Sequence, residues 1–179
     1  MKKDLEKEIE IPEDVTIRLE GNELIVKGPE GENKRKFNFK EMEIKIEDRK
    51  IFVNKKQANK KDKRNINSTI AHITNLILGV RKKYEYVLEI CSVHFPMNVK
   101  IEKDKLIIKN FLGERKERLI KIDPKVEIEL KGSQIIIKSS DKEKAGLQAT
   151  RIEGISRSVS RDKRIFQDGI WITKKEKGR

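Results

Sequence analysis

The sequence repeats itself once, and this duplication limits the folds that the chain can adopt. The segment PEDVTI at residues 12–17 returns as PMNVKI at residues 96–101, at an offset of 84 residues. The segment LIVKGPEGE at residues 24–32 returns as LIIKNFLGE at residues 106–114, now at an offset of 82. The change in offset falls in a turn, where a fold tolerates insertions. Each copy spans roughly 80 residues, which is longer than a solenoid repeat, so we interpret the pattern as a tandem duplication of one small domain.

The repeat predicts two domains, residues 1–83 and residues 84–179, in which strands come first and a helix last. Val15, Ile17 and Leu19 alternate with polar residues, as in a strand with one buried face, and turn residues follow them. The same order returns in the second copy. The predicted fold class is therefore α+β, with two tandem copies of a small domain, each an antiparallel sheet packed by one helix.

Two amphipathic helices are expected, over residues 65–80 and residues 141–160. Apolar side chains recur three and four residues apart in both segments, which places them on one face of each helix. They are Ile66, Ile70, Ile73, Ile77 and Val80 in the first helix, and Ala145, Ala149, Ile152, Ile155 and Val159 in the second. Residues 84–89 are interpreted as a short connector that holds the two domains in a fixed relation.

The charge balance indicates a polyanionic partner. The chain has 43 Lys and Arg residues against 30 Asp and Glu residues, a formal net charge of +13 at pH 7 and a pI near 9.7. Its single cysteine, Cys91, excludes an intrachain disulfide and favours a reducing compartment. No apolar run reaches the length of a membrane span or a signal peptide. We therefore expect a cytoplasmic protein that makes no membrane contact.

Residues suited to catalysis are few. The two histidines, His72 and His94, provide neither a metal cluster nor a Cys-His pair at ligand spacing. The glycine-containing segment at residues 28–31 lacks the Lys-Ser/Thr of a phosphate loop and is interpreted as a turn. A triad assembled in space is not excluded by sequence. The prediction is a protein that is not an enzyme and holds no cofactor or metal.

Basic residues concentrate before and after the predicted helices. The run KKQANKKDKR at residues 55–64 is expected to form a loop before the first helix, and it is a candidate phosphate clamp. Its candidate RNA-binding residues are Lys60, Lys61, Lys63 and Arg64. A solvated loop of an alkaline protein is the alternative interpretation of this run.

The second helix provides a more specific pattern. At 100° per residue, Thr150, Gly154, Arg157 and Arg161 fall opposite the apolar face, which combines small side chains with guanidinium groups. A glycine within a helix costs about 1 kcal/mol relative to alanine, and close approach of an RNA backbone would explain it. A helix that simply tolerates Gly154 is the alternative. Four further basic residues follow as candidate contacts: Lys163, Arg164, Lys174 and Lys175. Because aromatic residues make up only 5% of the chain, recognition of folded RNA by shape and phosphate is favoured over base stacking.

The run RDKRIFQDGIWI at residues 161–172 resembles the carboxyl-terminal signature of the large-subunit ribosomal protein six family. The matching structural residues of this signature segment are Phe166, Asp168, Gly169 and Trp171, and Trp171 stands where the family usually has tyrosine. The segments VKGPEGE at residues 26–32, HFPMNV at residues 94–99 and NFLGE at residues 110–114 are also similar to the family, the last two to its archaeal and eukaryotic branch.

The resemblance implies a structural component of the large ribosomal subunit. It implies a place at the stalk base, beside neighbouring ribosomal proteins and near the docking region of translational GTPases. It also implies that the second domain makes most contacts with large-subunit ribosomal RNA. The bias toward Lys, Glu and Ile favours a thermophilic archaeal source. Within the signature segment, Phe166, Ile170 and Trp171 are expected to anchor the segment while polar and basic residues face RNA.

Two other functions are compatible with a basic surface. An RNA-modifying or RNA-processing enzyme would need a polar pocket with perturbed carboxylates. A protein-interaction scaffold would use its charge only for solubility, and salt-dependent binding to ribosomal RNA would distinguish an RNA-binding protein from it.

Overall fold

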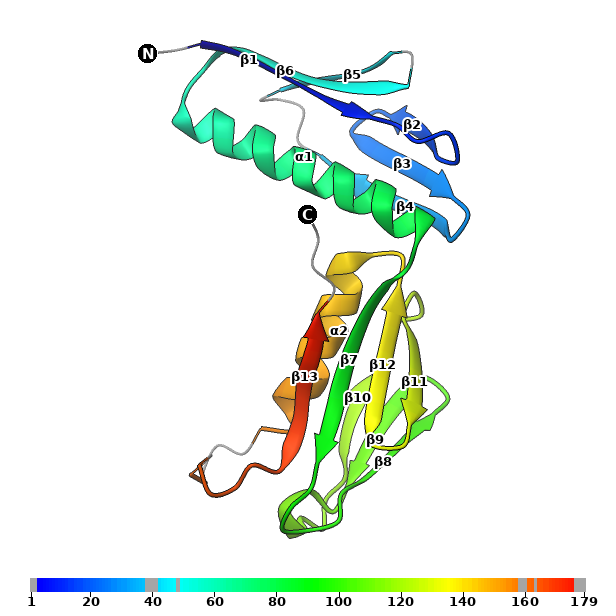
Figure 1. Cartoon of the computed structure of the whole chain (residues 1–179), viewed down its shortest axis with the longest axis vertical. Coiled ribbons are helices and arrows are strands. Elements are labelled where there is room, and N and C mark those ends of the chain that lie inside the picture. Colours follow the sequence, from blue (N-terminus) through cyan, green and yellow to red (C-terminus); the bar gives the residue numbers. More distant parts are fainter. Residues whose placement is uncertain (1–2, 38–41, 48, 158–160, 163, 176–179) are drawn as a thin grey trace. The chain divides into compact units, whose positions relative to one another are not determined.

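A computed structural model describes residues 3–37, 42–47, 49–157, 161–162 and 164–175. The chain divides into two compact units, residues 1–83 and residues 84–179. Each unit combines antiparallel sheets with one helix, so the predicted α+β fold of two tandem copies is confirmed (Figure 1). Each copy contains two small sheets, whereas the prediction assigned one sheet to each.

The described residues of the first unit form six strands and a long helix. Its elements are β1 (Lys3–Glu10), β2 (Thr16–Glu20), β3 (Glu23–Gly28), β4 (Gly31–Lys36), β5 (Glu43–Glu47), β6 (Lys50–Ala58) and α1 (Lys60–Arg81). The strands form one sheet in the order β2-β3-β4 and another in the order β1-β6-β5. Helix α1 contacts β3 and β4 of the first sheet and β6 and β1 of the second, so one apolar helix face covers both sheets.

The second unit repeats this plan and adds a strand. Its elements are β7 (Tyr84–Cys91), β8 (Asn98–Glu102), β9 (Lys105–Lys109), a short 3-10 turn (Phe111–Gly113), β10 (Arg118–Lys121), β11 (Glu127–Lys131), β12 (Gln134–Ser139), α2 (Lys142–Ile155) and β13 (Gly169–Lys175). The sheets have the orders β10-β9-β8 and β11-β12-β7-β13. Since β12, β11 and β7 correspond to β6, β5 and β1, the additional strand is β13.

The apolar positions that repeat in the sequence are the same positions that are buried in the two cores. Ile73 of α1 and Ile152 of α2 are both completely buried against the sheets of their own units. The equivalent strand residues are also completely buried: Leu24 and Leu106, Val26 and Ile108, Ile51 and Ile135, and Val53 and Ile137. Each such side chain contributes roughly 1.5 to 3 kcal/mol by its burial, which explains why the duplication preserves them.

The expected start of the first helix is wrong by five residues. Helix α1 begins at Lys60, because Asn59 caps it by accepting hydrogen bonds from the backbone N–H groups of Lys61 and Asp62. The Asp62 side chain in turn accepts from the Asn59 N–H at 2.9 Å, which completes a capping box. Residues 60–64 therefore lie in the first turns of the helix and not in a loop.

The expected end of the second helix is also wrong. Helix α2 ends at Ile155, and Ser156 follows as a buried C-cap residue. The Ser156 hydroxyl accepts a hydrogen bond from the Ile170 N–H at 2.9 Å, which ties the helix end to β13. Arg157 and Arg161 are consequently outside the helix, and the predicted line of four residues on one helix face is not formed. Val159 lies outside the described residues.

The segment expected to connect the domains is a strand. Residues 84–89 belong to β7, which lies between β12 and β13 in its sheet. Tyr84, Tyr86 and Leu88 alternate with more exposed residues and point into the core. This alternation is the period of a strand, and the lack of glycine or proline in the segment is consistent with it.

Gly28 fits a close approach between β3 and the end of α1. A Cβ atom at this position would lie 2.8 Å from both the Cγ2 and the carbonyl oxygen of Val80. We predict that Gly28→Ala destabilises the protein by about 1 to 3 kcal/mol, because the helix backbone must shift. Urea denaturation measures this change. Gly154→Ala is the matched control, since nothing lies within 4 Å of its added Cβ, and its stability should rise by up to about 1 kcal/mol. Equal effects of the two substitutions would contradict the close approach.

Candidate nucleic-acid interface

The described part of the signature segment (residues 161–172) is anchored through one buried carboxylate. Asp168 is 4% exposed, and its Oδ1 accepts hydrogen bonds from the backbone N–H groups of Val93 at 2.8 Å and His94 at 2.9 Å. Its Oδ2 lies 2.6 Å from Nδ1 of His94. Burial by itself would raise the pKa of Asp168, but these hydrogen bonds outweigh it and lower the pKa below its usual value. Asp168 thereby ties the segment before β13 to the loop after β7.

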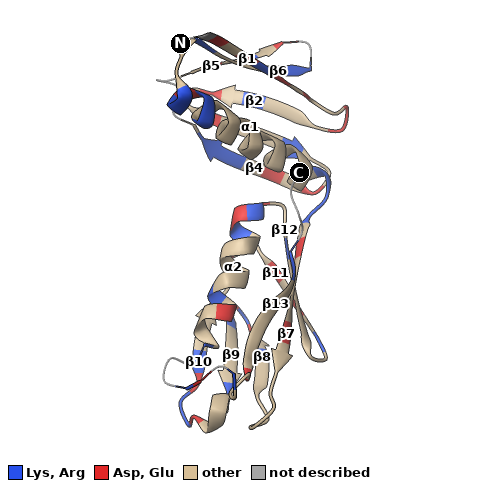
Figure 2. Ribbon diagram, turned by 60° about the vertical axis from the view of Figure 1, so that its left-hand side comes forward, with Lys and Arg blue, Asp and Glu red and all other residues tan. Residues whose placement is uncertain are grey.

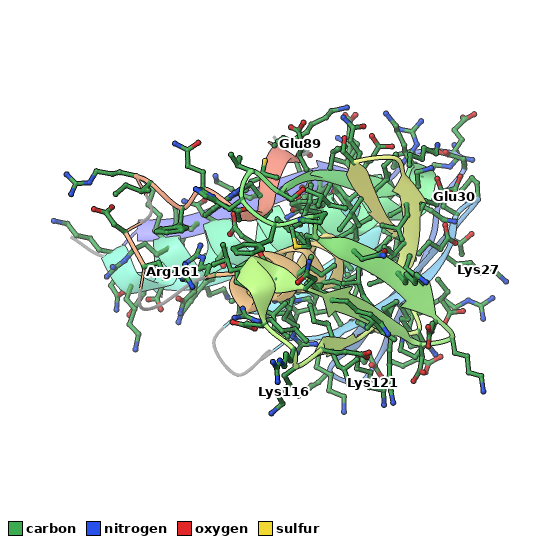
Figure 3. All side chains as sticks on the ribbon, turned by 90° about the horizontal axis from the view of Figure 1, so that it is seen from below. Lys27, Glu30, Glu89, Lys116, Lys121 and Arg161 are labelled. Carbon is green, nitrogen blue, oxygen red and sulfur yellow. The ribbon has the colours of Figure 1, made fainter. Side chains whose placement is uncertain are left out.

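Aromatic contacts extend this anchor to a basic side chain. The rings of His94 and Phe166 have centroids 4.8 Å apart, and the guanidinium carbon of Arg161 lies 4.7 Å from the centroid of Phe166. A guanidinium over an aromatic face is attracted by the ring quadrupole. Phe166 is half-buried against the core of the second unit, whereas Arg161 is exposed. Arg161 is labelled in Figure 3 and belongs to the segment that precedes β13. The stack therefore orients a cation on the surface.

Gly169, Ile170 and Trp171 are placed by contacts within the second unit. Ile170 is fully buried. A Cβ on Gly169 would lie 3.2 Å from the Trp171 ring and 3.3 Å from the carbonyl oxygen of Ser156, so the site favours glycine. The indole Nε1 of Trp171 donates to the Gln167 carbonyl at 3.1 Å. The indole N–H of Trp171 is thus hydrogen-bonded within the segment. The hydroxyl of a tyrosine at this position would lie at a different distance from the Gln167 carbonyl.

The predicted basic residues of the second unit are exposed and partly paired. Arg157 lies 3.1 Å from a Glu153 carboxylate oxygen, and Arg164 lies 2.8 Å from one of Asp162. Exposed pairs of this kind contribute at most about 1 kcal/mol, so either arginine can turn toward a phosphate at little cost. Lys163 lies outside the described residues.

Two groups of the predicted residues are separated within the second unit. Thr150 and Gly154 are exposed on the last turns of α2, next to Arg157. Lys174 and Lys175 are at the far end of β13 from the signature turn, roughly 20 Å along the strand. Lys174 also lies 3.7 Å from Glu85. The end of α2 is joined to the signature segment through the hydrogen bond between Ser156 and Ile170, whereas Lys174 and Lys175 lie away from that segment.

Sequence reasoning missed Arg118, which organises the end of α2. Its Nη1 donates to the Ile155 carbonyl, and its Nε and Nη2 bind the Glu114 carboxylate at 2.8 and 2.6 Å. Its guanidinium carbon lies 4.2 Å from the ring centroid of Phe111. The hydrogen bond with Arg118 lowers the pKa of Glu114. Phe111 and Glu114 both belong to the NFLGE motif. An aromatic ring and a carboxylate together favour a cation as their partner, but the motif does not identify that partner as Arg118.

The basic cluster of the first unit occupies the amino-terminal end of α1. Lys60, Lys61, Lys63 and Arg64 are exposed there, and Figure 2 shows the basic residues in these first turns. Cations at this end oppose the helix dipole, so helix stability does not explain them. Asp62 is buried among them, and the hydrogen bond from Lys55 at 2.7 Å lowers its pKa. The position of the cluster at the amino-terminal end of a helix therefore favours anion binding, and this position was not predicted from the sequence.

The described residues hold little that resembles a catalytic centre. Among them no group of three or more His, Cys, Asp or Glu side chains is placed to hold a metal ion. Nε2 of His94 has no hydrogen-bond partner in the described part of the chain, so no serine or cysteine completes a triad with Asp168 there. A cavity of about 540 Å³ lies on the outward face of β2-β3-β4. Its lining mixes basic and acidic side chains, among them Arg18, Glu32 and Lys34. These are the outward-facing residues of alternating strands, so the cavity does not need a catalytic explanation.

Comparison with known proteins identifies the family. The sequence pattern of the family described as Ribosomal protein L6 matches residues 11–83 and again residues 95–169. A relative from Methanobrevibacter smithii is 40% identical over 172 residues, which cover 96% of this chain and 97% of the relative. Relatives from Sulfurisphaera tokodaii and Nanoarchaeum equitans are each 42% identical over 173 residues, covering 96% and 92% of this chain and 93% and 90% of their own lengths. All three carry the name large ribosomal subunit protein uL6.

The class that these observations define is a duplicated α+β ribosomal protein. The chain belongs to the ribosomal protein L6 family. The resemblance seen in the signature and in the motifs of both copies is confirmed. Membership in a family of structural ribosomal proteins also agrees with the prediction that the chain is not an enzyme. None of the described helices has both the length and the apolar character needed to cross a membrane.

The buried carboxylate makes a prediction about pH. Because the folded-state pKa of Asp168 is lowered, its stabilising effect is present above the unfolded pKa of about 4 and is lost as pH falls through the folded value. We predict that Asp168→Asn lowers the free energy of unfolding at neutral pH, and that the difference from the unsubstituted protein narrows in acid. Urea denaturation between pH 7 and pH 2 measures both effects. Asp162→Asn, at an exposed position of the same segment, is the control and should change stability less. A difference that stayed constant with pH would show that the ionised carboxylate is not the source.

Proposed function

We propose that this chain is a component of the large ribosomal subunit and binds its ribosomal RNA chiefly through the second unit. Arg157, Arg161, Lys163 and Arg164 would contact phosphates, and Thr150 and Gly154 would allow the RNA backbone to approach the end of α2. The observation that carries the proposal is the Asp168 anchor, which fixes a basic segment to the core and holds Arg161 on the Phe166 ring. Family membership supports the same function.

Total charge does not distinguish the two units. Residues 1–83 contain 21 basic and 15 acidic side chains, and residues 84–179 contain 22 and 15, so the excesses are six and seven. The difference lies in side-chain order. The guanidinium of Arg161 is already oriented by a ring, and a planar guanidinium binds phosphate in two parallel hydrogen bonds. The lysines at the start of α1 must lose more rotamer freedom on binding. The second unit is therefore expected to contribute the larger share of affinity.

The basic cluster of the first unit would provide a secondary contact. Lys60, Lys61, Lys63 and Arg64 surround the positive end of α1, where a phosphate would meet both the side chains and the helix dipole. Lys174 and Lys175, at the far end of β13, would contact RNA separately from the signature segment. Position at the stalk base, contact with neighbouring ribosomal proteins and proximity to translational GTPases are proposed on the resemblance alone.

Charge reversal tests where the affinity resides. We predict that Arg157→Glu with Arg161→Glu weakens binding to archaeal large-subunit ribosomal RNA much more than Lys60→Glu with Lys61→Glu. Affinity falls as salt rises, and each lost phosphate contact should make the slope of log affinity against log salt less steep by about one unit. Filter binding at several salt concentrations measures both quantities, and circular dichroism checks that each variant is folded. Equal or greater loss in the Lys60 and Lys61 variant would assign the main contact to the first unit, and loss in neither would remove the RNA proposal.

Gly154 tests whether RNA approaches the end of α2. Nothing lies within 4 Å of a Cβ added there, so Gly154→Leu should leave thermal stability unchanged or raise it, since leucine favours a helix more than glycine does. We predict that the same substitution weakens RNA binding by about tenfold or more, because the side chain holds the backbone away from the helix. Leu147→Gln, at a position that is 52% exposed two turns earlier, is the control and should have little effect. Unchanged RNA binding in Gly154→Leu would show that the glycine is merely tolerated.

A further inference from the structure

The two units differ at one sheet edge. In the second unit, β7 is flanked by β12 on one side and by β13 on the other. In the first unit, β1 occupies the place of β7, and the sheet of described residues ends with it. The correspondence follows from the registers, because Ile9 pairs with Ile51 and Leu88 pairs with Ile135, the residue 84 positions after Ile51. The edge that β13 fills in one copy is therefore open in the other.

Within the described part of the chain, this edge presents unpaired backbone groups at three residues. Ile11 donates its backbone N–H to the Arg49 carbonyl at 2.8 Å, which continues the register of β1 with β6. In an antiparallel pair the hydrogen-bonded residues alternate, so Ile9 and Lys7 also direct their backbone groups toward β6. Glu6, Glu8 and Glu10 consequently direct their N–H and C=O groups away from the sheet. A bulge at Asp4, whose carboxylate accepts the Gln57 N–H, ends the regular edge.

The charge on the same sheet is opposite to that of the whole chain. The pairing register places nine residues on the outward face of β1-β6-β5, and seven of them are charged. Its charged members are Glu6, Glu8, Glu10, Glu43 and Glu47, against Lys45 and Lys50. In the row of Glu6 and Glu43, the Asn54 side-chain oxygen is buried and has no hydrogen-bond partner within the described part of the chain. This face repels RNA, and it favours a partner that carries cations and hydrogen-bond donors.

We propose that β1 accepts an extended, lysine-rich segment of a neighbouring protein as an added antiparallel or parallel strand. The backbone of the segment would pair with Glu6, Glu8 and Glu10, and its alternate cationic side chains would lie over the acidic outward face. A second copy of this chain does not fit, because β1 against β1 would align the same carboxylates. The inference rests on the proposed place in a large subunit.

Charged residues on an edge strand also have a simpler role, which is to prevent aggregation. The two roles make different predictions for the assembled particle. A strand that only avoids aggregation stays open to solvent when the chain enters the subunit. A strand that accepts a partner becomes protected along its outward backbone groups.

The experiment compares amide hydrogen exchange of the free chain with that of purified large subunits containing it. We expect the amides of Glu6, Glu8 and Glu10 to exchange about a hundredfold more slowly in the subunit. Carbodiimide crosslinking of the same subunits, followed by mass spectrometry, should join these carboxylates to lysines of one extended protein segment. Unchanged exchange, or protection without a crosslink to a protein lysine, would overturn the proposal.

Two substitutions at Glu8 separate backbone pairing from charge. Glu8→Pro removes one outward N–H without removing a backbone hydrogen bond to β6, because proline is tolerated at a sheet edge, and it should abolish the protection of Glu6 and Glu10. Both substitutions remove the ion pair of the Glu8 carboxylate with Lys50 at 3.1 Å, but Glu8→Gln keeps the N–H and should retain that protection. If Glu8→Pro does not assemble, the unsubstituted subunit still decides the outcome. Sedimentation of the chain with the large subunit tests the proposed function separately.

Discussion

Each unit depends on one helix that covers two small sheets at the same time. The sheets of the first unit have three strands each, and neither could bury an apolar face alone. Helix α1 supplies the shared surface, with Ile66, Ile73 and Val80 buried along its length. In α2 the same task falls to Ala145, Ala149 and Ile152. Because alanine leaves room for close approach, the shorter helix can lie near a sheet of four strands.

The sequence was sufficient for the parts of the fold that apolar periodicity controls. Repeated positions such as Leu24 and Leu106 predicted the duplication and the two cores, because burial constrains side-chain type. Helix ends were predicted poorly, since they depend on contacts with distant residues. The Ser156 hydroxyl ends α2 by meeting Ile170, and no local pattern in residues 141–160 reports that contact. β13 was missed as a strand for the same reason, because its pairing with β7 joins residues about 80 positions apart.

The candidate interface was predictable in composition and not in geometry. Clustered basic residues and the signature motif indicated Arg161 and Arg164 from sequence. The role of His94 was not visible there, because it depends on a carboxylate 74 residues away. The structure also separates two functions within one short segment. Asp168, Gly169 and Ile170 face the protein, while Arg161 and Arg164 face outward. Substitutions of the outward-facing charges leave the segment anchored only while these inward-facing residues are retained.

The additional strand β13 has a consequence for the order in which the protein matures. It follows every other described element of the chain, and it is paired with β7, the first strand of its unit. Synthesis proceeds from the amino terminus, so β7 must wait for almost the entire second unit before this neighbour emerges. Asp168 lies just before β13, and the loop containing His94 therefore lacks its anchor until the same moment. A nascent chain therefore acquires the ordered basic segment only when its second core is complete, which places this step at the end of folding.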